Sequence, residues 1–407
     1  MDAISSKASP AVQRTSHSII LAASGSHLIN DLIQFLLPAL YPLLKVNYEL
    51  DYMQIGLLTL AQQFTACILQ PVMGLYGDVK PKPYLLPLSL AIVTIGVIML
   101  ATANSFMLLF LAAMVLGIGS ALFHPEASRM ARLASGGRLG YAQSSFQVGG
   151  NAGTAIGPIA AALIVLPLGQ FSTIWFGLFA VLGIMLLTYV ARWYSAHQLL
   201  AASRPAVVTT KPAISRRRLI IAFSVIGALL LSKYVYIETF KSYYTFYLIE
   251  KFDLPVQDAQ FYLFMFLGAI AVGTFAGGPI GDRFGRLTVI WGSIVGALPF
   301  TLILPFLDLY WTAVVSITIG LILASAFSAI VVYSQELVPG KVGMVSGFVF
   351  GFAFGIGAIG AAVLGAVADT TGMVWVFGLC AFLPVLGFLT IFLPKTAELY
   401  PSQKVRA

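Results

Sequence analysis

The chain has 407 residues, of which 59% are hydrophobic and only 9% are charged. Soluble domains carry about 25% charged residues, and the mean hydropathy of this chain is +0.93. The composition excludes an ordinary soluble enzyme, a disordered chain and a nucleic-acid-binding domain. We therefore interpret the net charge of +8 as the basic cytoplasmic surface of a membrane protein.

The first sixteen residues are polar and predict a cytoplasmic tail (1–16). A cleaved signal peptide is not expected, because the apolar run that follows is far longer than an h-region. The two cysteines, Cys67 and Cys380, both lie in apolar runs. They predict neither a disulfide framework nor a metal site.

Twelve apolar stretches follow, each close to the roughly 20 residues that a membrane-spanning helix needs. They cover residues 17–44, 53–77, 84–103, 106–128, 142–165, 174–194, 219–248, 260–280, 287–306, 311–333, 343–367 and 374–393. We predict an all-α polytopic membrane protein with twelve transmembrane helices in two pseudo-symmetric six-helix bundles. The bundles span 17–194 and 219–394, with a cytoplasmic linker at 195–218 and a cytoplasmic tail at 395–407.

Basic residues predict the orientation. With both termini in the cytoplasm, all but four of the 23 Lys and Arg residues fall on the cytoplasmic side. The exceptions are Lys45 and Lys251 in outer loops, and Lys233 and Lys241 within a span. The outer loops carry the acidic residues Glu49, Asp51, Glu250, Asp253, Asp258, Asp308 and Asp369. The positive-inside rule therefore places both termini in the cytoplasm.

The two halves repeat a motif at the same place in the topology. The Gly-x-x-Gly-Asp pattern at 74–78 recurs at 278–282, and Gly-Arg-Leu-Gly at 137–140 recurs as Gly-Lys-Val-Gly at 340–343. Parallel repeats of this kind are a transporter architecture, with the substrate site between the halves near the bilayer midplane.

Residues 278–286, Gly-Pro-Ile-Gly-Asp-Arg-Phe-Gly-Arg, resemble the G-x-x-x-D-R-x-G-R signature of the major facilitator superfamily. The resemblance implies the fold of that family and a gate that stabilises one access state. The implied gating residues are Asp78, Gly278, Asp282, Arg283, Gly285 and Arg286. The first-half copy departs from the signature after Asp78, where Val79 and Lys80 follow.

Several strings resemble one subgroup of this superfamily, the fosmidomycin resistance proteins. They are Ser-His-Leu-Ile-Asn-Asp at 26–31, Phe-His-Pro-Glu-Ala-Ser-Arg at 123–129, Ala-Ser-Gly-Gly-Arg at 134–138, Phe-Gln-Val-Gly-Gly-Asn at 146–151, Ser-Lys-Tyr at 232–234 and Ser-Tyr-Tyr-Thr-Phe-Tyr at 242–247. The resemblance implies a proton-driven exporter of phosphonate antibiotics such as fosmidomycin or fosfomycin. Residues 153–158 also resemble the end of the antiporter motif, and packing of small residues between helices is the alternative.

Five ionisable side chains interrupt the predicted spans away from their ends: Asp31, Glu126, Lys233, Glu238 and Lys241. A charge in hydrocarbon costs about 2.5–3.5 kcal/mol, so each is expected to face a polar cavity or a partner. Asp31 lies near mid-bilayer, with His27 and Gln34 one turn away on the same helix face. A carboxylate shielded from water retains a proton more readily, which predicts proton coupling at Asp31 and His27. A permanently ionised partner of Lys233 is the alternative for Asp31.

Lys233 lies at nearly the same depth in the second half. The superfamily's spans one, four, seven and ten line the cavity, so the resemblance places Lys233 opposite Asp31. Its ammonium group either meets an anionic phosphonate or neutralises Asp31. The other predicted cavity residues are Arg129, Gln34, Gln147, Asn151, Tyr234 and Glu238.

The end of the fourth span adds further candidates. Glu126 and Arg129 can pair along one helix face, either within the transport route or as a structural ion pair at the membrane edge. His124 and Glu126 are predicted to join the proton route. We predict no metal site, because the sequence shows no further His or Cys ligand near His124.

Three classes of function compete. A secondary transporter explains the repeat, the gate signature and the sparse charges within the spans. An intramembrane enzyme would need clustered carboxylates, a metal set or a nucleophile with its base, and a channel has little use for two gated halves. No P-loop is present, so we expect no cofactor and a proton gradient as the driving force.

We therefore predict a monomeric, multi-pass antiporter of the bacterial inner membrane. Its expected partners are a small anionic phosphonate, protons and membrane lipid, and no nucleic acid. The alternative is a major facilitator transporter of another small organic anion or a sugar.

Cysteines that replace Ser203 and Asp308 should react with an impermeant maleimide from opposite sides of the membrane, Ser203 from the cytoplasm, because basic residues gather on that side. Labelling of intact cells and of inverted vesicles measures this, in a parent that lacks Cys67 and Cys380. Labelling of both positions from one side would contradict the twelve-span topology.

Overall fold

The structure is a computed structural model that describes residues 15–40, 43–44, 47–50, 52–202, 214–254 and 256–399. These residues form helices joined by short turns, with no β-strand among them. Most of the predicted N-terminal tail, the middle of the linker (203–213) and the end of the C-terminal tail (400–407) lie outside the described residues. Lys45, Asp51 and Ser203 also lie outside them.

The helices follow one another in two sets. The first set contains α1 (His17–Ala39), α3 (Tyr52–Val79), α4 (Leu85–Thr102), α5 (Phe106–Ala134), α6 (Leu139–Ala160), η1 (Ala161–Val165), α7 (Leu166–Leu168), η2 (Gln170–Trp175) and α8 (Phe176–Ala202). The second contains α9 (Arg216–Phe252), α10 (Val256–Phe284), α11 (Arg286–Ile303), η3 (Leu304–Phe306), α12 (Leu309–Leu337), α13 (Val342–Thr371), α14 (Met373–Cys380), η4 (Leu383–Phe392) and α15 (Thr396–Leu399).

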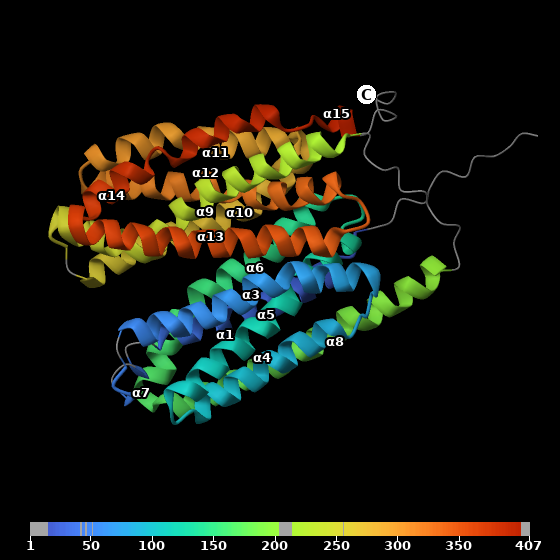
Figure 1. Ribbon diagram of the computed structural model, residues 1–407, viewed down its shortest axis with the longest axis horizontal. Helices are drawn as coiled ribbons and strands as arrows, with labels where there is room; N and C mark the ends of the chain where they lie inside the picture. The colour runs from blue at the N-terminus through green and yellow to red at the C-terminus, as the bar shows by residue number, and fades with distance from the viewer. Residues whose placement is uncertain are drawn as a thin grey trace, which may run out of the picture.

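Each set forms one bundle, and the two bundles lie side by side (Figure 1). Within the first bundle α1 packs on α6 and α5 packs on α3 and α4, whereas in the second α12 packs on α10 and α11. The bundles meet mainly where α13 packs on α3 and α10 packs on α6. This all-helical arrangement of two bundles confirms the predicted fold class.

Ten segments of the described chain are long and apolar enough to cross a membrane. The two further predicted spans correspond to α3 and α6, which are 28 and 22 residues long. Their hydropathy is lowered by amide side chains such as Gln62, Gln70, Gln147 and Asn151, and these line the cavity between the bundles. A polar face of this kind is compatible with a span because it faces protein and not lipid.

Several helices differ from the predicted spans in their ends. Helix α8 continues to Ala202 and α9 begins at Arg216, beyond the predicted ends at 194 and 219. Apolar composition marks only the part of a helix in hydrocarbon, whereas backbone hydrogen bonding continues into water. The side chain of Ser215 accepts a hydrogen bond from Arg218 N at 3.3 Å and caps α9.

The last predicted span is divided into α14 and the 3-10 segment η4. Pro384 lies in the first turn of η4 and offers no N–H group to continue an α-helix.

Asp282 joins the bundles at the end of the molecule where α8 ends and α9 begins. Its carboxylate accepts hydrogen bonds from the backbone N–H groups of Gly140 at 2.8 Å and Tyr141 at 3.0 Å. These groups lie in the first turn of α6, whose positive dipole end favours an anion. The close approach requires glycine, because a Cβ on Gly140 or on Gly278 would overlap the carbonyl oxygen of the other.

Asp78 makes the equivalent contact in the opposite direction. It accepts hydrogen bonds from Gly343 N and Met344 N, both at 2.9 Å, in the first turn of α13. Gly74 and Gly343 approach as closely as the glycines of the other pair. The first-half motif therefore forms the same bundle-to-bundle contact, although its sequence departs from the signature after Asp78.

The remaining signature residues act within the second bundle. Arg286 lies 3.5 Å from Asp282 and 3.3 Å from Glu336 of α12, so it connects α10, α11 and α12. Gly285 has a φ of 92°, which favours glycine at the turn into α11. Arg283 is exposed and lies over the ring of Phe284, so its predicted gating role is not supported by a contact between the bundles.

The contacts of Asp78 and Asp282 hold the bundles together at one end of the molecule, which we call the closed end. Asp282→Asn and Asp78→Asn should each open the closed end, because each removes a carboxylate that caps a helix of the other bundle. A charge-assisted hydrogen bond contributes roughly 1.5–3 kcal/mol, so maleimide labelling of a cysteine at buried Ser346 should rise about tenfold or more. Asp253→Asn, at an exposed turn, is the matched control. An unchanged labelling rate in both variants would contradict the capping role.

Candidate functional site

A cavity of about 340 Å³ lies between the bundles and is lined by residues of α1, α3, α5, α6, α9, α10, α12 and α13. Most of the predicted cavity and proton-coupling residues line it: His27, Asp31, Gln34, His124, Gln147, Asn151, Lys233, Tyr234 and Glu238. Residues of helices far apart in the sequence therefore meet at one cavity that has both polar and apolar lining residues, as expected for a transporter of this architecture.

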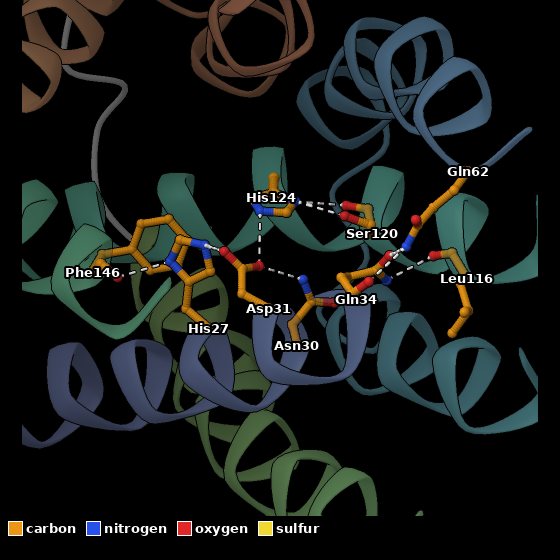
Figure 2. Close-up of polar contacts among 9 residues, drawn as sticks. All are labelled: His27, Asn30, Asp31, Gln34, Gln62, Leu116, Ser120, His124 and Phe146. Atoms are coloured by element: carbon orange, nitrogen blue, oxygen red, sulfur yellow. Dashed lines mark hydrogen bonds and ion pairs between the residues drawn. The ribbon is translucent and has the colours of Figure 1, made fainter. Parts of the chain in front are cut away.

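Asp31 lies between two histidines on one wall of the cavity (Figure 2). His27 Nε2 is 3.3 Å from Asp31 Oδ2, and His124 Nε2 is 3.5 Å from Asp31 Oδ1. Asn30 donates a hydrogen bond of 2.9 Å to Asp31 Oδ1. Helical spacing places His27 one turn before Asp31 on α1, whereas His124 reaches the carboxylate from α5.

Backbone carbonyl groups orient both imidazole rings. His27 Nδ1 lies 2.8 Å from Phe146 O, and His124 Nδ1 lies 3.0 Å from Ser120 O. A carbonyl oxygen only accepts, so each Nδ1 carries a proton. In both rings Nε2 points towards Asp31.

Amide side chains continue this polar surface along the cavity. Gln34 donates to Leu116 O at 2.9 Å and accepts from Gln62 Nε2 at 2.7 Å. Asn30 and Gln62 were not among the predicted site residues, and neither was Gln70. Gln62 and Gln70 are eight positions apart on one apolar helix, a spacing that could have indicated a cavity-facing stripe.

Lys233 lies on the wall formed by the second bundle. Its side chain is buried, with Nζ 3.4 Å from Ala324 O and 5.2 Å from the centre of the Phe327 ring. Among the described residues, no carboxylate forms an ion pair with Lys233. The alternative interpretation, an ion pair between Lys233 and Asp31, is therefore not seen in the structure. Asp31 instead contacts His27 and His124.

Farther along α9, Glu238 and Lys241 form an ion pair, with 3.4 Å between Lys241 Nζ and Glu238 Oε2. Tyr234 packs edge-on against the ring of Phe327. Asn151 of α6 donates a 3.0 Å hydrogen bond to Thr274 of α10, which links the two bundles across the cavity.

Glu126 and Arg129 lie outside the cavity, which differs from the predicted position of Arg129. They form an ion pair of 2.5 Å, and Arg129 also donates to Gly77 O at 2.8 Å. The reason is helical geometry: two residues correspond to about 200° of rotation, so Glu126 faces α3 when His124 faces the cavity. The structural ion pair, one of the two sequence interpretations, fits this position.

The trio of His27, Asp31 and His124 bears on the prediction of no metal site. Their donor atoms lie within 4.8 Å of one another, and the two imidazole rings are 5.1 Å apart. The premise that no second histidine lies near His124 is therefore wrong, because helix packing brings His27 to it. Such a trio could hold a divalent cation or share protons.

Known proteins resemble this chain over nearly its full length. The model of the Major Facilitator Superfamily matches residues 23–358 and 235–406. The fosmidomycin resistance protein of Escherichia coli K12 is 52% identical over 387 residues, 95% of both chains. An uncharacterised MFS-type transporter, YfnC of Bacillus subtilis 168, is 41% identical over 394 residues, again 95% of both chains.

Among solved structures, the transporter FucP in its outward conformation superimposes with a TM-score of 0.71. The match covers 93% of this chain and 99% of FucP at 15% identity, so it concerns the fold alone. Together with the two-bundle architecture and the polar central cavity, these similarities show that the chain is a multi-span membrane transporter and belongs to the Major Facilitator Superfamily, in the subgroup that includes the fosmidomycin resistance protein.

Proposed function

We propose that the protein is a proton-coupled antiporter that exports small anionic phosphonates, such as fosmidomycin or fosfomycin, by alternating access. The observation that carries the proposal is Lys233, a buried ammonium group without a carboxylate partner among the described residues. It lines the same cavity as Asp31, which is paired with His27 and His124.

The cavity suits a small anion. Its volume of about 340 Å³ lies at the lower end of the range of small-molecule sites, roughly 300–1,000 Å³. A buried ammonium group without a counter-ion is unfavourable, and a phosphonate oxygen would supply the missing charge. The amides that line the cavity can donate further hydrogen bonds to the ligand.

The Asp31 cluster supports coupling to protons. Imidazole is the side-chain type that exchanges protons near neutral pH, and both rings line the cavity that the substrate would enter. The relative's name refers to resistance to fosmidomycin, which a transporter would provide by lowering the concentration of the drug inside the cell. An inward proton gradient drives export of the substrate only if the transporter changes its access side while it carries either protons or substrate, and not both.

In this proposal the closed end faces the cytoplasm and carries both termini, as the basic residues indicate. The protein acts as a single copy in the bacterial inner membrane, and the proton gradient replaces any cofactor.

Asp31→Asn should abolish gradient-driven export, because the amide keeps the shape of the carboxylate but removes the negative charge that holds the coupled protons at the cluster. Fosmidomycin accumulation in inverted proteoliposomes with an imposed pH gradient should fall to the level of empty liposomes. The dissociation constant for fosmidomycin should stay within a few-fold of the wild-type value. Asp258→Asn, an exposed carboxylate at the start of α10, is the control, and export of wild-type pH dependence in Asp31→Asn would reject the role.

Lys233→Met should weaken fosmidomycin binding about ten- to a hundredfold, because a charge-assisted hydrogen bond contributes roughly 1.5–3 kcal/mol. Titration calorimetry measures the change, and Lys82→Met, at an exposed position, is the control. Lys233→Arg should retain part of the affinity, since it keeps the charge on a larger, planar group.

The double variant Asp31→Asn with Lys233→Met distinguishes the two roles of the lysine. Binding that stays weak agrees with direct contact between Lys233 and the anion, whereas restored binding would show that Lys233 mainly neutralises Asp31. Transport of a carboxylate anion, with neither phosphonate transported, would replace the proposed substrate class.

A further inference from the structure

The two imidazoles beside Asp31 have the same arrangement. In each ring Nδ1 faces a backbone carbonyl, Phe146 O for His27 and Ser120 O for His124. In each ring Nε2 is buried and has no hydrogen-bond partner, although a carboxylate oxygen lies 3.3 or 3.5 Å away. Both orphan nitrogens therefore point at Asp31.

This arrangement is unfavourable in a neutral imidazole. With the ring proton on Nδ1, Nε2 presents a lone pair, and it would face a carboxylate oxygen that also only accepts. A buried acceptor without a donor costs roughly 1–3 kcal/mol. The empty cluster thus contains two unfavourable contacts, one at each oxygen of Asp31.

Two protons remove both contacts. A proton on His27 Nε2 gives an N–H donor for Asp31 Oδ2, and a proton on His124 Nε2 gives one for Oδ1. One proton leaves one pair of acceptors facing each other, wherever it binds. Protonation of Asp31 itself is no remedy, because one O–H group serves only one of the two nitrogens.

The neighbouring carboxylates already have basic partners, so we assign these protons to the cluster. Within the same cavity, Glu238 is paired with Lys241, and outside it Glu126 is paired with Arg129. Lys233 is the remaining charged group of the cavity wall. The polar groups of α6 that line the cavity, Gln147 and Asn151, are amides and do not titrate.

We propose that His27, Asp31 and His124 form a binding site for two protons, one on each Nε2, and that both are exchanged for each substrate molecule. The inference rests on the proposed proton-coupled export and specifies its stoichiometry. Asp31 stays ionised throughout, so the cluster alternates between one negative charge when empty and one positive charge when loaded.

The test is the substrate gradient that a pH gradient sustains. Proteoliposomes with the full-length protein are held at zero membrane potential by valinomycin and potassium, in EDTA, with both sides above the second ionisation of the phosphonate. A gradient of one pH unit should sustain about a hundredfold gradient of fosmidomycin if two protons are exchanged, and about tenfold if one is. A tenfold gradient in the wild type would overturn the two-proton site.

Single variants assign the protons to the rings. In His27→Gln and in His124→Gln the amide can donate to Asp31 without taking up a proton, so each should sustain only about a tenfold gradient. His17→Gln, which alters a histidine at the exposed start of α1, should keep the hundredfold gradient. A hundredfold gradient in either cluster variant would also overturn the assignment, whereas failure of the wild type to couple fosmidomycin to protons would overturn the proposed function itself.

Discussion

A charge removed from water needs a partner, and this requirement organises the interior of the protein. Asp31 is placed between two histidines, and Glu126 and Glu238 each pair with a basic residue of the same helix. Lys233 is the exception among these groups, since its described contacts are a carbonyl oxygen and the rings of Tyr234 and Phe327. Because Glu126 and Glu238 have basic partners, Lys233 is the charge of this group that an anion entering the cavity would neutralise.

The closed end has a reciprocal construction. Asp78 from the first bundle caps a helix of the second, and Asp282 from the second caps a helix of the first. A rigid-body rotation of one bundle would break both contacts together, because neither belongs to a single bundle. We therefore expect the two caps to act as one cooperative latch between discrete access states rather than as two independent contacts.

Periodicity, charge and a short motif predicted much of this architecture. The apolar stretches predicted the spans, and the cost of charge in hydrocarbon predicted that Asp31 and Lys233 face a cavity. The pairing of His27 with His124 could not be predicted, because they lie on different helices and meet only through packing. The prediction that Arg129 lines the cavity was wrong, because the helices that pack on α5 determine which of its faces points to the cavity. The contact made by Asp78 likewise depends on the position of α13, which the local motif does not specify.

Two helices with amide-rich faces, α3 and α6, also make the most extensive contacts with the opposite bundle, through α13 and α10. Such a helix gains less from lipid than its neighbours do, so it enters the bilayer less readily as an isolated segment. Asn151 of α6 obtains its partner, Thr274, only after α10 has been synthesised, whereas Gln62 of α3 already pairs with Gln34 within the first bundle. Biogenesis of the first bundle is therefore expected to finish late, when the second bundle arrives to cover these faces. The wall of the central cavity is then the last part of the protein interior to be assembled.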